Sequence, residues 1–242
     1  MAVNPTVVSS ISFFENASDE DKLSVSSSAA LRACRGSEVL SRSGQIQEAV
    51  GFILHGRFQI KEVADDGRVV RLSILGPGDA IGWLSLVDDG FFSDEVTALE
   101  SGQLLLCPTR SLRTVVSGSR TLLSALLHLA ARSIRNNTKE RTMLTLPSAF
   151  QRICFQLSTL AGQLGSVDPD STGGLPRQHD LATAANTTRE TVSRTLQILA
   201  KAGVIQKTGH RVIVRRRDLL QRLANDGLES LPVNHQEASS KQ

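Results

Sequence analysis

Residues 178–205 read QHDLATAANTTRETVSRTLQILAKAGVI, which is the layout of a helix-turn-helix. We expect a short helix over residues 179–185 and a second helix over residues 188–201. Asn186 lies between them, where the chain needs a left-handed backbone that Asn tolerates. On a helical wheel, three apolar residues of the second helix share the face that packs on the core: Val192, Leu196 and Leu199.

The opposite face of the second helix is polar and suits contact with DNA. It carries Glu190, Arg194, Gln197 and Lys201, and Arg189 lies at its flank in the first turn. The N-terminal turns of a recognition helix enter the major groove. There arginine offers two parallel donors to guanine, and glutamate accepts a hydrogen bond from cytosine. We expect Thr187 and Thr188 to bind phosphates, helped by the free amides of the helix N-terminus.

A second interpretation of the same residues is purely structural. Residues 187–190 also match the capping-box pattern, Ser or Thr followed three residues later by Glu. In that arrangement Glu190 would bind its own helix terminus instead of a base. The motif alone does not distinguish a Glu190 that reads a base from a Glu190 that caps its own helix.

The residues that follow the second helix are strongly basic. VIQKTGHRVIVRRR (residues 204–217) predicts a hairpin turning at Thr208–Gly209, which would form a wing beside the DNA backbone. We expect Lys207 and Arg211 to contact phosphates. Residues 177–217 carry nine Lys or Arg against two acidic residues, a net charge of +7, whereas the rest of the chain carries −4. This asymmetry indicates a polyanion partner for that segment alone.

The N-terminal half has the pattern of many short strands. From about residue 31 to 108, glycines recur every few residues between short apolar or alternating runs. ADDGRV (residues 64–69) is a hairpin turn signal, and Val70, Leu72 and Ile74 alternate onto one face. We therefore expect an antiparallel β jelly-roll barrel.

A long helix follows, because no glycine or proline occurs between about residues 119 and 146. Along one face of this helix, residues at alternating spacings of four and three positions resemble a heptad seam, which predicts a dimer interface. They are Leu123, Leu127, Ala130, Ile134, Asn137, Arg141 and Leu144. A second stripe predicts packing on the barrel: Leu122, Leu126 and Leu129. The alternative is a long helix packed only within its own chain.

Pro147 ends that helix, and Ser148 with Gln151 predicts a capping box for the next one. Its core stripe is Ile153, Leu157, Leu160 and Leu164, with Cys154 beside it as a buried apolar residue. The fold class is thus α+β, and the expected organisation has four parts. They are a barrel domain over residues 1–117, a dimerisation helix over 118–146, a winged helix-turn-helix over 147–224 and a disordered tail over 225–242.

Composition excludes several classes of protein. The three cysteines, Cys34, Cys107 and Cys154, are far apart and have no metal-ligand spacing, so we expect no metal and a reducing cytoplasm. No signal peptide is expected, and the longest uncharged apolar stretch, residues 121–131, is too short to span a membrane. The absence of a P-loop, a dinucleotide fingerprint and a nucleophile motif predicts that the protein is not an enzyme.

The chain resembles the CRP/FNR family of bacterial regulators over roughly residues 11–223. The resemblance rests on TRETVSRTLQIL (188–199) with AGVI (202–205), and on GFILHGRFQI (51–60) and LGPGDAIG (75–82) in order. It implies a cyclic-nucleotide-binding-type jelly roll, a dimer helix and a DNA-binding winged helix-turn-helix. It implies that Arg189, Glu190 and Arg194 read bases in TGTGA-like half-sites, and it implies three partners: double-stranded DNA, a second copy of the chain and RNA polymerase.

The sensor residues depart from that resemblance. Cyclic-AMP-binding members carry Gly-Glu and, about ten residues later, Arg-Ser. Here Gly82 fits, but Trp83 replaces the glutamate and Ser93 or Asp94 replaces the arginine, with Glu95 following. We place these residues, with Asn137, at a degenerate effector pocket. An attractive charge lost at about 5 Å removes roughly 3 kcal/mol, or about two decades of affinity.

We therefore expect cyclic AMP not to be the effector, and Trp83 to fill the pocket as part of the core. The iron–sulfur cluster found in some members needs several clustered cysteines, and neither His55 nor His128 indicates a haem ligand. The remaining alternative is a sensor of another nucleotide or small molecule whose DNA-binding domain is secondary. The effector, the target genes and the direction of regulation are not encoded in any motif we find.

Overall fold

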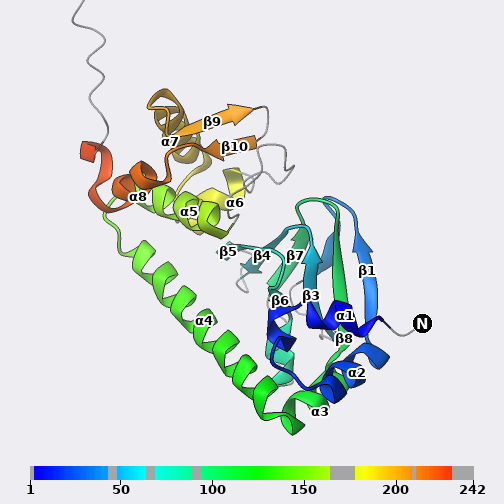
Figure 1. Cartoon of the computed structure of the whole chain (residues 1–242). Helices are drawn as coiled ribbons and strands as arrows, with labels where there is room; N and C mark the ends of the chain where they lie inside the picture. Colours follow the sequence, from blue (N-terminus) through cyan, green and yellow to red (C-terminus); the bar gives the residue numbers. More distant parts are fainter. Residues whose placement is uncertain are drawn as a thin grey trace, which may run out of the picture. The chain divides into compact units, whose positions relative to one another are not determined.

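The computed structural model describes residues 3–42, 48–63, 69–88, 94–163, 178–208 and 211–230. The chain forms two compact units (Figure 1). The first extends to Arg141 and the second begins at Thr142, so the division falls inside the long helix α4 (Arg120–Leu144).

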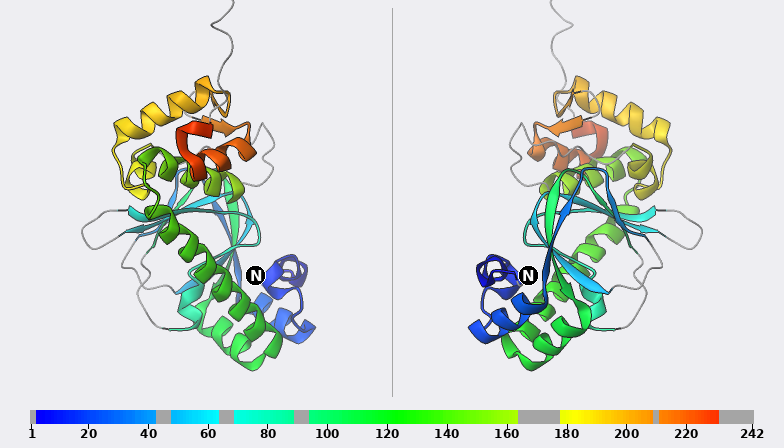
Figure 2. Two further views of the ribbon diagram at one scale, coloured as in Figure 1. Left: turned by 90° about the vertical axis from the view of Figure 1, so that its left-hand side faces the viewer. Right: turned by 90° about the vertical axis from the view of Figure 1, so that its right-hand side faces the viewer.

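The first unit is built on two four-stranded antiparallel sheets. One has the strand order β1-β8-β3-β6 and the other β2-β7-β4-β5. The strands are β1 (Ala30–Cys34), β2 (Val39–Ser41), β3 (Ala49–His55), β4 (Phe58–Val63), β5 (Val69–Leu75), β6 (Ala80–Ile81), β7 (Asp94–Ala98) and β8 (Gly102–Pro108). The sheets face each other in a jelly-roll-like arrangement, which confirms the predicted fold class, although they do not close into a complete barrel (Figure 2).

Alternation along the strands explains how the first sheet is buried on both faces. Ile53 and Leu104 point between the two sheets, whereas their neighbours Phe52 and Leu105 point outward. All four are at most 3% exposed. Because both faces are covered by apolar side chains, the strands read as nearly continuous apolar runs.

Helices that the sequence analysis did not identify cover the outer face of this sheet. They are α1 (Pro5–Ser9), η1 (Ser12–Phe14), α2 (Asp19–Ser28) and α3 (Thr109–Gly118). Phe14 packs edge-on against Phe52 with ring centroids 4.9 Å apart. The start of α2 is fixed by Ser18, whose hydroxyl accepts a hydrogen bond from the amide of Asp21 at 3.1 Å.

The pairing of β4 with β5 confirms the predicted hairpin. The ladder runs from Phe58–Leu75 to Val63–Val69. The turn itself, in residues 64–68, lies outside the described residues. On β5, Leu72 and Ile74 are buried as expected, at 1% and 2% exposure.

Helix α4 is apolar on two sides, as predicted. It begins at Arg120, after α3 and the extended residue Ser119, and not at residue 118. Leu122 and Leu126 are 1% and 9% exposed and join Leu129 in packing on the core of the first unit. On another face of α4, Leu127 and Ile134 are 71% and 65% exposed.

The second unit contains the remaining helices and a small sheet. Its elements are α5 (Ala149–Gln163), α6 (Gln178–Ala184), α7 (Arg189–Lys201), β9 (Ile205–Thr208), β10 (Arg211–Val214), α8 (Arg217–Asp226) and η3 (Gly227–Ser230). Ser148 caps α5 as predicted, but the Gln151 side chain binds the Ser148 hydroxyl, whereas a capping box uses the backbone amide of the capping residue. The amide of Gln151 donates to Ser148 Oγ at 3.1 Å, and Ser148 Oγ donates to Gln151 Oε1 at 2.8 Å.

The prediction of a disordered tail from residue 225 is wrong at its start. Helix α8 continues to Asp226, and η3 extends to Ser230. Gln151 Nε2 donates to the carbonyl of Asn225 at 2.8 Å, which ties this end of α8 to α5. Gly227 then changes the chain direction with φ of +79°. The last twelve residues, 231–242, lie outside the described part of the chain.

Candidate nucleic-acid interface and sensor cavity

The helix-turn-helix is formed as the motif predicts. Asn186 has φ of +46°, the left-handed conformation expected at the turn. The amide of Asn186 donates to the carbonyl of Thr183 at 3.0 Å, and that of Thr187 donates to the carbonyl of Ala182 at 2.9 Å. These bonds satisfy the turn's amides and set the direction of α7.

Arg152 on α5 is hydrogen-bonded to this turn, a role that was not predicted from the sequence. Its guanidinium donates to three backbone carbonyls, those of Ala185 at 2.9 Å, Leu146 at 3.0 Å and Asn186 at 3.3 Å. The side chain therefore joins the turn to the segment that follows α4. The available signal was an arginine flanked by apolar residues and Gln151 in AFQRICF (residues 149–155).

The polar face of α7 is exposed and basic. Arg189, Glu190, Arg194, Gln197 and Lys201 are all exposed, whereas Val192, Leu196 and Leu199 are at most 1% exposed. Neither Arg189 nor Arg194 forms an ion pair within the described part of the chain. A shallow depression is lined by residues that include two not predicted from sequence, Gln178 and Ser193.

The N-terminus of α7 differs from the capping box considered above. The capping residue is Thr188, not Thr187, and its Oγ1 accepts from the amide of Thr191 at 3.2 Å. Glu190 is thus the second helical residue. A hydrogen bond from its own amide, then one from the Thr188 hydroxyl, hold the pKa of Glu190 below its ordinary value. The carboxylate is ionised and exposed at the end of α7 that a groove would meet.

The wing is a two-stranded hairpin. β9 and β10 pair from Val214–Ile205 to Arg211–Thr208, so Thr208 belongs to a strand. The turn predicted at Thr208–Gly209 falls largely on residues 209–210, outside the described residues. Arg215 donates to Gln206 Oε1 at 2.6 Å and 3.0 Å across the hairpin. The side chain of Lys207 is exposed, and that of Arg211 is not described.

A cavity of about 130 Å³ lies between the sheets and α4 in the first unit. Of the predicted pocket residues, Gly82, Trp83 and Asp94 line this cavity. Glu95 and Asn137 do not, and Ser93 lies outside the described residues. The neighbouring Asn136 takes the place expected for Asn137. Trp83 is half-buried and also packs against the core, so it occupies space beside the cavity.

The charges around the cavity disfavour a bound anion. Asp94 and Asp79 line it, and its one cationic lining residue in the described chain, Arg132, lies 3.3 Å from Asp79 Oδ1. Glu95, next to Asp94 on β7, points to the other side and lies 3.6 Å from Lys61 Nζ across the strand pair. The ion pair of Arg132 therefore competes with any phosphate for the same guanidinium.

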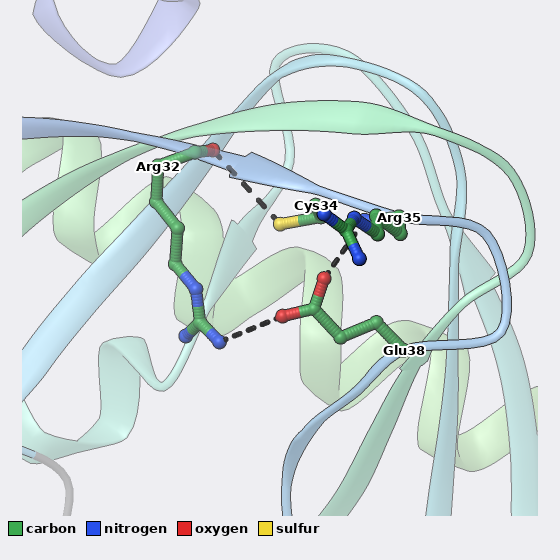
Figure 3. A network of polar contacts seen from close by, with 4 residues as sticks. All are labelled: Arg32, Cys34, Arg35 and Glu38. Atoms are coloured by element: carbon green, nitrogen blue, oxygen red, sulfur yellow. Dashed lines mark hydrogen bonds and ion pairs between the residues drawn. The ribbon is translucent and has the colours of Figure 1, made fainter.

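The three cysteines are buried, and burial disfavours their reactive thiolate form. Burial raises the pKa of both Cys107 and Cys154 to about 12, and it also raises the pKa of Cys34. Beside Cys34, the Glu38 carboxylate binds the Arg35 amide at 2.8 Å and the Arg32 guanidinium at 3.1 Å (Figure 3). The Arg35 hydrogen bond is the main reason why the pKa of Glu38 lies below its ordinary value.

Metal and membrane signals are absent from the described residues. No three His, Cys, Asp or Glu side chains among them are grouped so as to hold a metal ion. None of the helices in those residues has the length and apolarity that crossing a bilayer requires.

Comparison with known proteins matches both units. Residues 31–119 match the model of the cyclic nucleotide-binding domain, and residues 151–223 match that of the Crp-like helix-turn-helix domain. The chain is 31% identical over 182 residues to the cyclic AMP receptor protein of Thermus thermophilus, covering 75% of this chain and 82% of that one. The chain belongs to the CRP/FNR family of transcription regulators.

Other CRP/FNR relatives agree with this placement. The nitrogen fixation regulation protein FixK of Azorhizobium caulinodans is 30% identical over 195 residues, which are 78% of this chain and 76% of the relative. The structure of FixK2 from Bradyrhizobium japonicum superposes with a TM-score of 0.65, covering 81% of this chain and 96% of that chain at 21% identity. That structural likeness supports the fold.

Proposed function

We propose that this CRP/FNR regulator is a homodimer that reads a palindromic DNA site with TGTGA-like half-sites. One observation carries the proposal: α7 exposes Arg189, Glu190 and Arg194 while both arginines are free of ion pairs in the described chain. Arginine can bind guanine O6 and N7 through two donors, and the ionised Glu190 can accept from cytosine N4. The half-site sequence is taken from the family resemblance.

Phosphate contacts would fix the register of α7 in the groove. Thr187 and Thr188 flank its N-terminus, where helical amides attract an anion. Lys207 and Arg211 occupy the wing strands, and we assign their charges to the DNA backbone. These four contacts supply affinity and salt dependence but little sequence preference.

The exposed face of α4 supports dimerisation. Leu123, Leu127 and Ile134 are 40%, 71% and 65% exposed, and Ala130 and Asn137 lie along the same seam. Apolar side chains at heptad spacing are usually covered by a second helix. A two-fold axis along α4 would place two recognition helices about one DNA turn apart, roughly 34 Å.

The cavity argues against cyclic AMP as the effector, although some relatives are named for it. The Thermus thermophilus relative is a cyclic AMP receptor protein, and one from Mycobacterium tuberculosis is a cAMP-activated regulator. Here Trp83 stands where the resemblance expects a glutamate, and Ser93 or Asp94 stands where it expects an arginine. Arg132 is engaged by Asp79. The cavity volume of about 130 Å³ is also below the roughly 300–1,000 Å³ of typical ligand sites.

We therefore propose a regulator that does not respond to cyclic AMP, acts in the cytoplasm, contacts RNA polymerase and catalyses no reaction. RNA polymerase follows from the family resemblance alone. The charges of the cavity support the claim about cyclic AMP. The claim of a cytoplasmic location rests on the widely spaced cysteines, and the claim of no catalysis rests on the missing catalytic motifs.

The decisive experiment is selection of bound sequences from random DNA by the ligand-free protein. We expect an imperfect palindrome with half-sites about one helical turn apart and an affinity that falls steeply with salt. If the enriched site lacked two-fold symmetry, the proposal that the protein binds DNA as a homodimer would be refuted. Failure to enrich any sequence in the absence of a ligand would refute effector-independent recognition.

Calorimetry with cyclic AMP tests the effector claim separately. We expect no binding at tens of micromolar, and the Thermus thermophilus relative serves as the positive control. A micromolar affinity would show that the cavity opens for the nucleotide and that our assignment of Trp83 and Asp94 is wrong.

A further inference from the structure

A second hollow, distinct from the cavity beside Trp83, lies where the N-terminal helical segment meets α4. Its volume is about 610 Å³, within the range of small-molecule sites. Residues 12–17, of η1 and the segment after it, form one side together with Gly78 and Ala80, and α4 from Thr121 to Arg135 forms the other. We call this hollow the η1–α4 groove.

The lining of the groove divides into an apolar part and a polar part. The apolar part consists of buried or half-buried side chains: Phe13, Ala17, Ala80, Ala125 and Leu129. The polar, uncharged part consists of Ser12, Asn16, Thr121 and Ser124. An apolar surface with a few converging polar groups is the usual composition of a site for a small organic molecule.

The remaining polar lining is basic. His128, Arg132 and Arg135 are spaced four and three residues apart on α4, so they lie along one face. No described lining residue is acidic. Asp79 engages Arg132 from outside the groove, but Arg135 is exposed and has no ion pair within the described chain. Like charges on one helix face destabilise the helix slightly, and a bound anion would remove that cost.

His128 adds a further group that a ligand can reach. Its Nδ1 lies 2.8 Å from the carbonyl oxygen of Ser124, an acceptor, so this nitrogen carries the hydrogen. Nε2 is then left available. The groove therefore presents the Arg135 guanidinium, and an imidazole nitrogen that can accept a hydrogen bond, beside an apolar surface.

The groove lies beside the seam of the proposed dimer. On a helical wheel, Ser124, His128 and Arg135 lie roughly 100° around α4 from Leu123, Leu127 and Ile134. The two sets of side chains therefore occupy neighbouring faces of the same helix.

We propose that the η1–α4 groove binds a small organic phosphate. Its apolar body packs on Phe13 and Leu129, and its phosphate accepts charge-assisted hydrogen bonds from Arg135. The site differs from the family's nucleotide cavity, which is smaller here and lined by Asp79 and Asp94. Ala80, Leu129 and Arg132 line both hollows, so Arg135 is the cationic residue that distinguishes them.

Calorimetric titration of the full-length protein with phenyl phosphate tests this proposal, because the probe combines a flat apolar body with a phosphate. We expect a dissociation constant below about 1 mM and much weaker binding of phenol. Arg135→Gln should weaken phenyl phosphate binding roughly tenfold, the loss expected for one charge-assisted hydrogen bond. Arg120→Gln is the matched control, because Arg120 is exposed on α4 but does not line the groove.

Four results would overturn the proposal. They are no binding below about 1 mM, equal affinity of the Arg135→Gln and wild-type proteins, an equal loss in Arg120→Gln, and equal affinity for phenol. Asp94→Asn should leave binding unchanged, and a change there instead of in Arg135→Gln would place the anion in the other cavity. Thermal melting of each variant checks that it is folded.

DNA is the competing anion, and its effect can be separated. If Arg135→Gln weakens DNA binding for every sequence while phenyl phosphate does not bind, the cations contact DNA and the proposal is wrong. If the protein fails to select a DNA site but binds phenyl phosphate through Arg135, the proposed function fails and the groove assignment holds.

Discussion

Helix α7 and the cavity beside α4 place arginines in opposite electrostatic settings. On α7, Arg189 and Arg194 are exposed and free of ion pairs in the described chain, so they remain able to bind an anion. In the cavity, Arg132 is held 3.3 Å from Asp79, and Asp94 lies on the same wall. Both regions have the family fold, yet only one presents uncompensated positive charge. A shared fold therefore does not show which of the two sites can bind an anion. The charges of the side chains at each site are a better guide.

The largest expected effect would come from separating the two copies of the proposed dimer at the α4 seam. Replacing Leu127 and Ile134 together by Glu puts two charges on the exposed apolar face. The protein should become monomeric by light scattering. DNA affinity should fall at least about a hundredfold, because the second half-site is no longer bound intramolecularly.

Lys139→Glu is the control for the seam, because Lys139 is exposed on α4 away from the apolar stripe. It should leave the protein dimeric. A double Glu variant that still scatters light as a dimer would show that α4 is not the interface. A monomer with unchanged DNA affinity would show that α7 needs no second copy.

Arg194→Ala tests whether an exposed arginine of α7 reads a base. Loss of a bidentate contact to guanine should cost about 1–3 kcal/mol per half-site and relax the preference at one base pair. Competition binding against a library of single-base variants measures both quantities. The same substitution at Arg132, which Asp79 engages, should leave every base preference unchanged.

Lys207→Ala provides the contrast expected of a phosphate contact. It should weaken all sequences alike and reduce the salt slope by about one per subunit. A base-specific change in Lys207→Ala, or a uniform change in Arg194→Ala, would reverse our assignment of the two residues.

Arg152→Gln tests whether the position of the turn matters to DNA reading. Gln cannot replace three donor contacts to Ala185, Leu146 and Asn186, so the second unit should lose about 1–3 kcal/mol of stability. Because the turn orients α7, specific DNA binding should weaken more than non-specific binding. Denaturant unfolding and competition binding measure the two effects. A stability loss without any change in the specificity ratio would limit Arg152 to a structural role.

The smallest effect concerns Glu190 and pH. Its pKa is lowered in the folded chain, so its stabilising contribution is present above the ordinary value of 4.5 and is lost as the pH falls through the lowered folded value. Glu190→Ala should flatten the acid side of the melting-temperature profile slightly. If Glu190 reads a base, the variant also loses preference at one base pair at neutral pH. A stability change with unaltered base preference would leave Glu190 as a helix-end residue only.

Local chemistry explains which elements the sequence could predict. The alternation of Leu72 and Ile74, the capping of α5 by Ser148 and Gln151, and the left-handed turn at Asn186 each follow from neighbouring residues. The core face of α7 followed from its helical period. These features involve few or no contacts between segments distant in the chain.

The missed features depend on contacts between such distant segments. The N-terminal helices cover a sheet whose outer face is visible only once Phe52 and Leu105 are placed. The contribution of Arg152 requires the turn 33 residues away to come within hydrogen-bonding distance. At the cavity, the sequence register identified Gly82, Trp83 and Asp94, but not the strand alternation that turns Glu95 toward Lys61. Whether Asn136 or Asn137 lines the cavity depends on the rotation of α4 about its own axis, which residue spacing alone does not define.

The burial of all three cysteines has a practical consequence for measuring this molecule. With pKa values of about 12, Cys107 and Cys154 hold roughly one thiolate in 10⁵ at neutral pH, and the pKa of Cys34 is raised as well. Because the thiolate is the nucleophile that attacks an alkylating reagent, the native chain should react slowly. A single cysteine introduced at the exposed position of Lys139 could then carry a spin label without removal of any native thiol. Pulsed electron resonance on that sample would report the distance between the two α4 helices of the proposed dimer directly in solution.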